Sequence, residues 1–172
     1  GLLGGHPDTN HDLGIDFSSG SLGHCLSVGV GVAIAKRNSN QNGRVYILVG
    51  DGELNEGMIW EAVMFTSSHN LTNITLIIDY NNLQGLGYSN SIITLDSLEN
   101  KFKSFGWSVS NINGHNVKSI INCFRKNYKK PHVIIAKTIK GKGLKDYENK
   151  INSHYFTIKN NDELKKLIKQ KK

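Results

Sequence analysis

Apolar residues in this chain fall into short runs that are separated by polar, glycine-containing stretches. Three runs, at 44–49 (RVYILV), 73–79 (NITLIID) and 132–138 (HVIIAKT), are almost wholly apolar and too short for typical helices. Runs of this kind are typical of parallel strands that are covered on both faces. A more mixed run at 107–112 (WSVSNI) is predicted as a fourth strand.

Segments with helical spacing alternate with these strands. The helices are predicted over 21–37, 56–69, 96–105 and 116–127. Alternation of strands and helices indicates an α/β fold, namely a doubly wound, mainly parallel sheet with helices on both faces. Gly29 and Gly31 lower helix propensity in the first helix, so we expect both to allow close packing. Trp60 and Trp107 are expected to be core or interface anchors.

The chain reads as one main domain with a basic end. No repeat or low-complexity linker divides it, and residues 80–91, which are rich in Asn and Gly, are predicted as a loop. We assign the domain to 1–158 and treat 159–172 as a Lys-rich tail, in which 161–171 could form a polar helix. Because the chain starts with Gly1 in what reads as mid-domain sequence, we expect further residues upstream.

Charge is unevenly distributed along the chain. The total of +7 divides into −7 for residues 1–100 and +14 for residues 101–172. A nucleic-acid binder would interleave aromatic residues with its basic residues, and the tail DELKKLIKQKK has none, so we expect no nucleic-acid partner. No apolar run is long enough to cross a membrane. Cys25 and Cys123 have neither a disulfide nor a metal-binding pattern, and they favour a cytoplasmic protein.

The strongest candidate for chemistry is a pair of motifs at the ends of two predicted strands. Gly50-Asp51-Gly52 directly follows one strand, and Asn81, with 28 residues between it and Gly52, comes just beyond the next strand. Carboxylate and amide oxygens suit Mg²⁺ or Ca²⁺, and a magnesium ion held by few protein oxygens usually also binds phosphates. The glycines allow close approach of the backbone to an anion, and the helix beginning near Asn55 could direct N–H groups to it. The alternative is that these residues form an ordinary turn and loop.

The two motifs together resemble the thiamine diphosphate motif, and their surroundings resemble the transketolase family, most closely the N-terminal subunit of its split form. The resemblance extends from about Gly4 to Tyr155. Besides GDGELNEGMIWEAVMF and IIDYNNLQGLG, it includes GGHPD, GIDFSSGSLGHCLSVGVGVAIA, FGWSV, NGHN and AKTIKGKG, in this order along the family pattern.

The resemblance implies a metal and diphosphate site. Asp51 and the side chain of Asn81 would bind Mg²⁺, for which Ca²⁺ or Mn²⁺ could substitute, and the carbonyl of Leu83 would be the third protein ligand. Gly50 and Gly52 would lie at the diphosphate of thiamine diphosphate.

The resemblance also implies ring and substrate contacts. Residues matching the loop beside the cofactor rings are Gly20, Ser21 and Leu22. His6 and His154 match histidines that face the substrate, with His154 also near the diphosphate, and Glu56 matches an acidic residue near the subunit interface. Without the resemblance, both histidines would read as surface residues. Two positions depart from the family pattern: Leu86, often acidic, and Tyr155, often Gly, and both could affect donor preference.

The function implied is transfer of a two-carbon ketol unit between sugar phosphates. The chain contains nothing that resembles the pyrimidine-binding domain, so the resemblance implies a C-terminal partner subunit, in a hetero-oligomer or dimer of heterodimers. Two alternatives remain open: a subunit similar to 1-deoxyxylulose-5-phosphate synthase, and a non-catalytic assembly subunit that binds the cofactor. The sequence GELNEG at 52–57 favours transketolase over the synthase.

Overall fold

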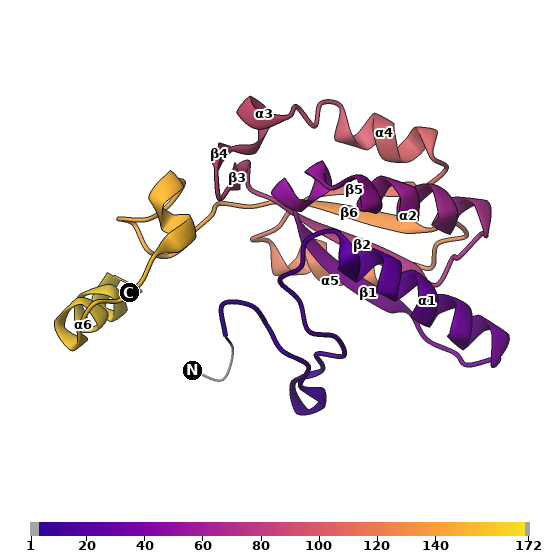
Figure 1. The fold of residues 1–172 in the computed structure, drawn as a ribbon, viewed down its shortest axis with the longest axis horizontal. Coiled ribbons are helices and arrows are strands. Elements are labelled where there is room, and N and C mark those ends of the chain that lie inside the picture. Colours follow the sequence, from indigo (N-terminus) through magenta and orange to yellow (C-terminus); the bar gives the residue numbers. More distant parts are fainter. Residues whose placement is uncertain (1–3, 171–172) are drawn as a thin grey trace.

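The computed structural model describes residues 4–170 and contains a central four-stranded sheet (Figure 1). The strands lie in the order β1 (Val45–Gly50), β2 (Ile74–Tyr80), β6 (His132–Lys137) and β5 (Ser108–Asn113). Every pairing in this sheet is parallel. The parallel α/β architecture predicted from the apolar runs is confirmed.

Helices follow the strands in the predicted alternation. Their bounds are α1 (His24–Asn38), α2 (Gly57–Ser68), α3 (Ser89–Ile92), α4 (Leu98–Ser104), α5 (Val117–Arg125) and α6 (Asn161–Gln170). Three 3₁₀ segments complete the described chain, η1 (His11–Leu13), η2 (Gly52–Asn55) and η3 (Ile151–Tyr155). The helix expected at 161–171 is therefore present as α6, and its expected last residue lies outside the described residues.

The strand order explains why helices cover both faces. The chain passes from β1 to β2, continues beyond the place of β6 to form β5, and then returns to form β6. With right-handed crossovers, this reversal places the connecting helix α5 on the face opposite to α2 and α4. The packing agrees, because α1, α2 and α4 share one apolar cluster while Cys123 of α5 belongs to another.

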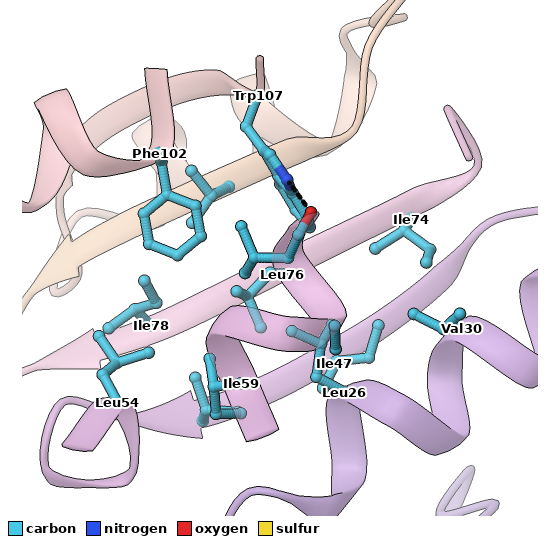
Figure 2. Packing of buried hydrophobic residues seen from close by; sticks show 14 of the residues in the cluster. Leu26, Val30, Ile47, Leu54, Ile59, Ile74, Leu76, Ile78, Phe102 and Trp107 are labelled. Carbon is cyan, nitrogen blue, oxygen red and sulfur yellow. Dashed lines mark hydrogen bonds between the residues drawn. The ribbon is translucent and has the colours of Figure 1, made fainter. Parts of the chain in front are cut away.

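The larger cluster forms the main core between the sheet and α1, α2 and α4 (Figure 2). Phe102 of α4 is fully buried and lies 5.4 Å, between ring centroids, from Trp60 of α2. Trp107 is buried beside Phe102, and its indole N–H donates to the carbonyl of Val63 at 3.1 Å. Trp107 is thus a core anchor, as its sequence context predicted.

Glycines near the first helix decide its start and its packing. Gly20 and Gly23 have φ angles of 116° and 84°, so residues 20–23 form a loop and α1 begins at His24 instead of residue 21. A Cβ on Gly29 would lie 2.7 Å from Ile47 of β1, which confirms close packing at that position. The same prediction is wrong for Gly31, which is exposed and has open space where a Cβ would be.

The segment predicted as a loop at 80–91 is more ordered than expected. It contains a short antiparallel hairpin of β3 (Leu83–Gln84) and β4 (Gly87–Tyr88), followed by α3. The chain reverses at Gly85 and Leu86, and Gly87, which begins β4, has a φ angle of 138° that an L side chain rarely adopts. The hairpin projects from the carboxyl end of β2 (Figure 1).

The second face of the sheet is covered only in part. Tyr46 and Leu48 of β1 point away from the main core and are 50% and 66% exposed. A cavity of about 380 Å³ lies on this face, with Leu48, Ile112 and Phe124 among its lining residues.

Among the described residues, no helix combines the length and the apolar character that a membrane span needs.

Candidate functional site

The two candidate motifs meet at one edge of the sheet. Gly50 at the end of β1 is in register with Asp79 near the end of β2. The N–H of Asp51 donates to the carbonyl of Asp79 at 3.2 Å, so the turn after β1 and the turn after β2 are joined by the backbone. This edge is where parallel α/β sheets bind ligands.

Asp51 is a buried carboxylate, with only 1% of its surface exposed. Its two oxygens accept from the backbone N–H of Asn82 and from the hydroxyl of Ser89, the latter at 3.1 Å. Burial raises the pKa of Asp51 above its ordinary value, while these hydrogen bonds act in the opposite direction. Within residues 4–170, no cationic side chain forms an ion pair with it. A buried carboxylate without a cation is a position that a metal ion would stabilise.

Asn81 and Leu83 flank Asn82, whose N–H donates to Asp51, in the turn after β2. The side chain of Asn81 donates to Asp79 at 3.1 Å and accepts from the N–H of Leu83 at 2.9 Å. Leu83 is buried and begins the β3–β4 hairpin. The three residues expected to bind a metal are therefore brought to two adjoining turns at the same edge of the sheet, with one carboxylate and neutral oxygens among their donors.

The GDG turn packs tightly against the hairpin. A Cβ on Gly52 would lie 2.6 Å from the Cβ of Gln84, so this position requires glycine. Gln84 also donates to the side-chain oxygen of Asn55 at 3.0 Å, while the amide nitrogen of Asn55 is buried without a partner among the described residues. The helix expected to begin near Asn55 begins at Gly57, because η2 occupies Gly52–Asn55.

The loop preceding α1 approaches the GDG turn. Gly23 donates its N–H to the carboxylate of Glu53 at 2.9 Å, across 30 residues of sequence. Ser21 is exposed and its hydroxyl lies 3.2 Å from Nδ1 of His24. Leu22 is 54% exposed, although an isolated Leu at the start of a helix would be expected in the core. The exposed loop is thus held close to the GDG turn, with an apolar side chain open to contact.

His6 joins this loop from the N-terminal segment. The ring of His6 packs against Gly20, where a Cβ would lie 3.1 Å from the Cγ and Cδ2 atoms of the imidazole. The side chain of His6 is exposed. The structure therefore brings together His6 and Gly20, two residues whose association the sequence did not suggest without the family resemblance.

His154 reaches the site from the opposite end of the chain. It lies in η3, where its Nε2 atom is 3.6 Å from the position of a Cβ on Gly85, in the β3–β4 hairpin. Partial burial, with a contribution from Lys140, lowers the pKa of His154, which favours the neutral imidazole at pH 7. In the adjacent KGKG loop, Lys142 forms an ion pair with Glu148 at 3.6 Å.

Glu56 occupies the N-cap position of α2 but makes no side-chain capping bond. Its side chain is exposed, while its Cβ packs against Gly23, at 3.0 Å from the position of a Cβ on that glycine. The carboxylate is therefore available at the surface, on the same side as the loop 20–23.

Several contributors to the site could not be identified from the sequence. Ser89 donates to Asp51 across 38 residues, and Glu53 holds Gly23 across 30 residues. Gln84 contacts both Gly52 and Asn55. No periodic pattern of residues in the sequence indicates these contacts. The place of Glu53 directly after the GDG motif is the one sequence feature that points to it. Among the described residues, no group of three or more His, Cys, Asp and Glu side chains could hold a metal ion, so a metal would depend on amide and backbone oxygens as well as Asp51.

Comparison with known proteins agrees with this arrangement. Residues 2–171 match the family model for the thiamine diphosphate binding domain of transketolase. The chain is 39% identical over 160 residues to a subunit of the 6-deoxy-6-sulfo-D-fructose transketolase of Clostridium sp. (strain MSTE9), covering 91% of this chain and 58% of that protein. It is 41% identical over 157 residues to a subunit of the apulose-4-phosphate transketolase of Phocaeicola vulgatus, covering 90% of this chain and 56% of that protein.

Comparison with solved structures agrees with the sequence comparisons. The crystal structure of transketolase from Campylobacter jejuni superposes with a TM-score of 0.78 and 32% identity, covering 84% of this chain and 24% of that chain. The chain thus spans little more than half the length of the subunits it matches. Together with the strand-end site, these matches show that the chain belongs to the transketolase family and corresponds to its N-terminal subunit.

Proposed function

We propose that this chain binds thiamine diphosphate through Mg²⁺ and, with a partner subunit, transfers a two-carbon ketol unit between sugar phosphates. The observation that carries the proposal is the buried carboxylate of Asp51, which faces the Asn81–Leu83 turn without a cationic partner in the described residues. The family match, described as a thiamine diphosphate binding domain, supports the same cofactor.

The donor atoms fit a hard metal ion. Asp51 and the side-chain oxygen of Asn81, with the carbonyl of Leu83, would hold Mg²⁺. To do so, Asn81 would exchange its hydrogen bond with the N–H of Leu83 for the metal. A metal held by few protein oxygens keeps positions for phosphate oxygens, and Gly50 and Gly52 would allow the backbone to approach them. Ca²⁺ or Mn²⁺ could substitute because they accept the same donors.

Residues of the exposed loop and the two histidines would contact the rest of the cofactor and the substrate. When bound, thiamine diphosphate supplies an electron sink for a carbanion. Gly20, Ser21 and Leu22 would lie beside its rings, where Leu22 would lose exposed apolar surface. His6 and His154 would hold or move protons on the substrate, and the lowered pKa of His154 keeps a nitrogen free to accept one near pH 7.

Partner binding is proposed for the side that carries Glu56. Its carboxylate is exposed beside the loop 20–23 and makes no capping bond, so it could pair with a group on a C-terminal subunit. That two relatives are named as transketolase subunits supports a hetero-oligomer.

The free thiols of Cys25 and Cys123 support a reducing, cytoplasmic location. We assign the cofactor-binding role to 1–158 and none to 159–172.

Substitution of Asp51 tests the metal site. In calorimetric titration with thiamine diphosphate and Mg²⁺, Asp51→Ala should weaken binding by about 100-fold or more, because even residues that only orient metal ligands cost about 10- to 100-fold. Asp51→Asn keeps an acceptor for Asn82 and serves as a second variant that preserves the local hydrogen bonding. Asp12→Ala removes an exposed carboxylate of η1 and is the matched control.

Circular dichroism would verify that the variants remain folded. Binding that is unchanged in folded Asp51→Ala and Asp51→Asn contradicts the metal assignment. Measuring two-carbon transfer after the chain is mixed with a pyrimidine-domain partner tests the activity, and cofactor binding without any transfer would indicate a non-catalytic role in assembly.

A further inference from the structure

The carboxylate of Glu53 connects two segments that are distant in sequence. Glu53 lies in η2, two residues after Asp51, and accepts the N–H of Gly23 at 2.9 Å. Gly23 ends the exposed loop 20–23 and is the N-cap of α1, where it has no side chain to form a capping bond. The contact therefore joins the start of α1 to the turn that follows β1.

Backbone N–H groups, including that of Gly23, favour the ionised form of the same carboxylate. The backbone N–H groups of Gly23 and Gly50 both lower the pKa of Glu53, against the larger effect of burial, which raises it. Glu56 adds a weaker repulsion. In the part of the chain that the structure describes, no Lys, Arg or His forms an ion pair with Glu53. The half-buried carboxylate of Glu53 thus accepts the backbone N–H of Gly23 and, among the described residues, has no ion pair with a cation.

The other contacts described for the loop 20–23 are either local or apolar. Ser21 interacts locally with His24, and Leu22 is exposed. The packing of Gly23 against Glu56 restricts how close the loop can come, since a Cβ at Gly23 would lie 3.0 Å from the Cβ of Glu56. Among the contacts described for this loop, the hydrogen bond from Gly23 to Glu53 is the polar one that joins it to the residues following the GDG motif.

We propose that Glu53 is a positioning residue, which sets the separation between the loop 20–23 and the GDG turn and so fixes the ring end of the cofactor relative to its diphosphate end. The proposal rests on the proposed function, because it assigns the two ends of one cofactor to these two segments. The affinity of a ligand that contacts both segments depends on their separation, whereas the affinity of a ligand that contacts only the GDG turn does not.

Two probes separate these cases in the full chain. Thiamine diphosphate with Mg²⁺ would contact both segments, and magnesium pyrophosphate would contact only the GDG turn. Hydrogen bonds to charged groups are strong enough that their loss corresponds to about 10- to 100-fold in affinity. We expect Glu53→Ala to lower the affinity for thiamine diphosphate by this factor and the affinity for magnesium pyrophosphate by less than about threefold.

Two further variants control the experiment. Glu53→Gln keeps one acceptor oxygen and should restore part of the affinity for thiamine diphosphate. Glu61→Gln changes an exposed carboxylate on α2 and should leave both affinities unchanged. Hydrogen exchange of the ligand-free chain gives an independent readout: amide exchange at Gly23 should become faster in Glu53→Ala, while exchange in β2 should not change.

The outcomes distinguish this proposal from the function on which it rests. If the wild type binds neither probe, the proposed cofactor site fails and the role of Glu53 fails with it. If the wild type binds both probes and Glu53→Ala weakens both equally, or neither, the cofactor site stands and the positioning role is overturned. Unchanged exchange at Gly23 would likewise overturn it.

Discussion

His132 provides a test of how burial sets the pH dependence of stability. It begins β6, is fully buried, and its ring stacks on Tyr128 with centroids 3.5 Å apart. Nε2 lies 3.0 Å from the hydroxyl oxygen of Ser110, and Nδ1 has no partner among the described residues. Burial, with smaller contributions from Arg44 and Lys126, lowers the pKa of His132 from 6.5 to about 4.

The direction of the effect follows from proton binding. Because the folded pKa of His132 lies below that of the unfolded chain, the unfolded state binds the proton more tightly. Its contribution to stability is therefore complete above pH 6.5 and is lost as the pH falls toward 4. With these pKa values, the free energy of unfolding should decrease by about 2 kcal/mol at pH 5 and about 3 kcal/mol at pH 4.

Urea unfolding at pH 7.5 and pH 5 would measure this loss in the wild type and in His132→Gln, which cannot titrate. Burial raises the pKa values of Asp51 and Glu53, so protonation of these two carboxylates stabilises the folded state as the pH falls. This effect is the same in the wild type and in His132→Gln, so it does not contribute to the difference between them. The wild type should lose about 2 kcal/mol more than the variant between the two pH values. His11→Gln, at an exposed histidine, should behave as the wild type. An equal pH dependence in the wild type and His132→Gln would refute the reasoning.

Two further substitutions test packing near the site and in the core. Gly85→Ala would place a Cβ 2.6 Å from the hydroxyl of the exposed Tyr155 side chain, so this side chain should turn away from the hairpin. Because its ring lies 4.8 Å, between centroids, from that of His154, we expect His154 to become more exposed and its pKa, measured by NMR titration, to rise toward its ordinary value. An unchanged pKa would contradict this contact. Trp107→Phe removes the hydrogen bond to Val63 and part of a buried ring, and should lower the free energy of unfolding by about 1–3 kcal/mol in urea. A loss below about 0.5 kcal/mol would show that Trp107 is not an anchor of the core.

Much of the fold could be predicted because the relevant signals are local. The apolar runs VYILV, ITLII and HVIIA identified β1, β2 and β6, since strands covered on both faces must be apolar at consecutive positions. The carboxyl ends of parallel strands share one edge, so the spacing of Gly52 and Asn81 was enough to predict that their turns would meet. The prediction for Gly31 was wrong because helix propensity does not reveal which face of α1 meets the sheet.

The sequence alone determined the succession of elements, their parallel arrangement and the sheet edge that carries Asp51 and Asn81. Only the tertiary structure decided the return of the chain from β5 to β6, the hairpin at 83–88, and the contacts that assemble the site. These contacts join Asp51 to Ser89, Glu53 to Gly23, and Gly85 to Tyr155. Each joins loops or short elements whose paths depend on the packing of whole helices and strands, and residue periodicity carries no information about those paths.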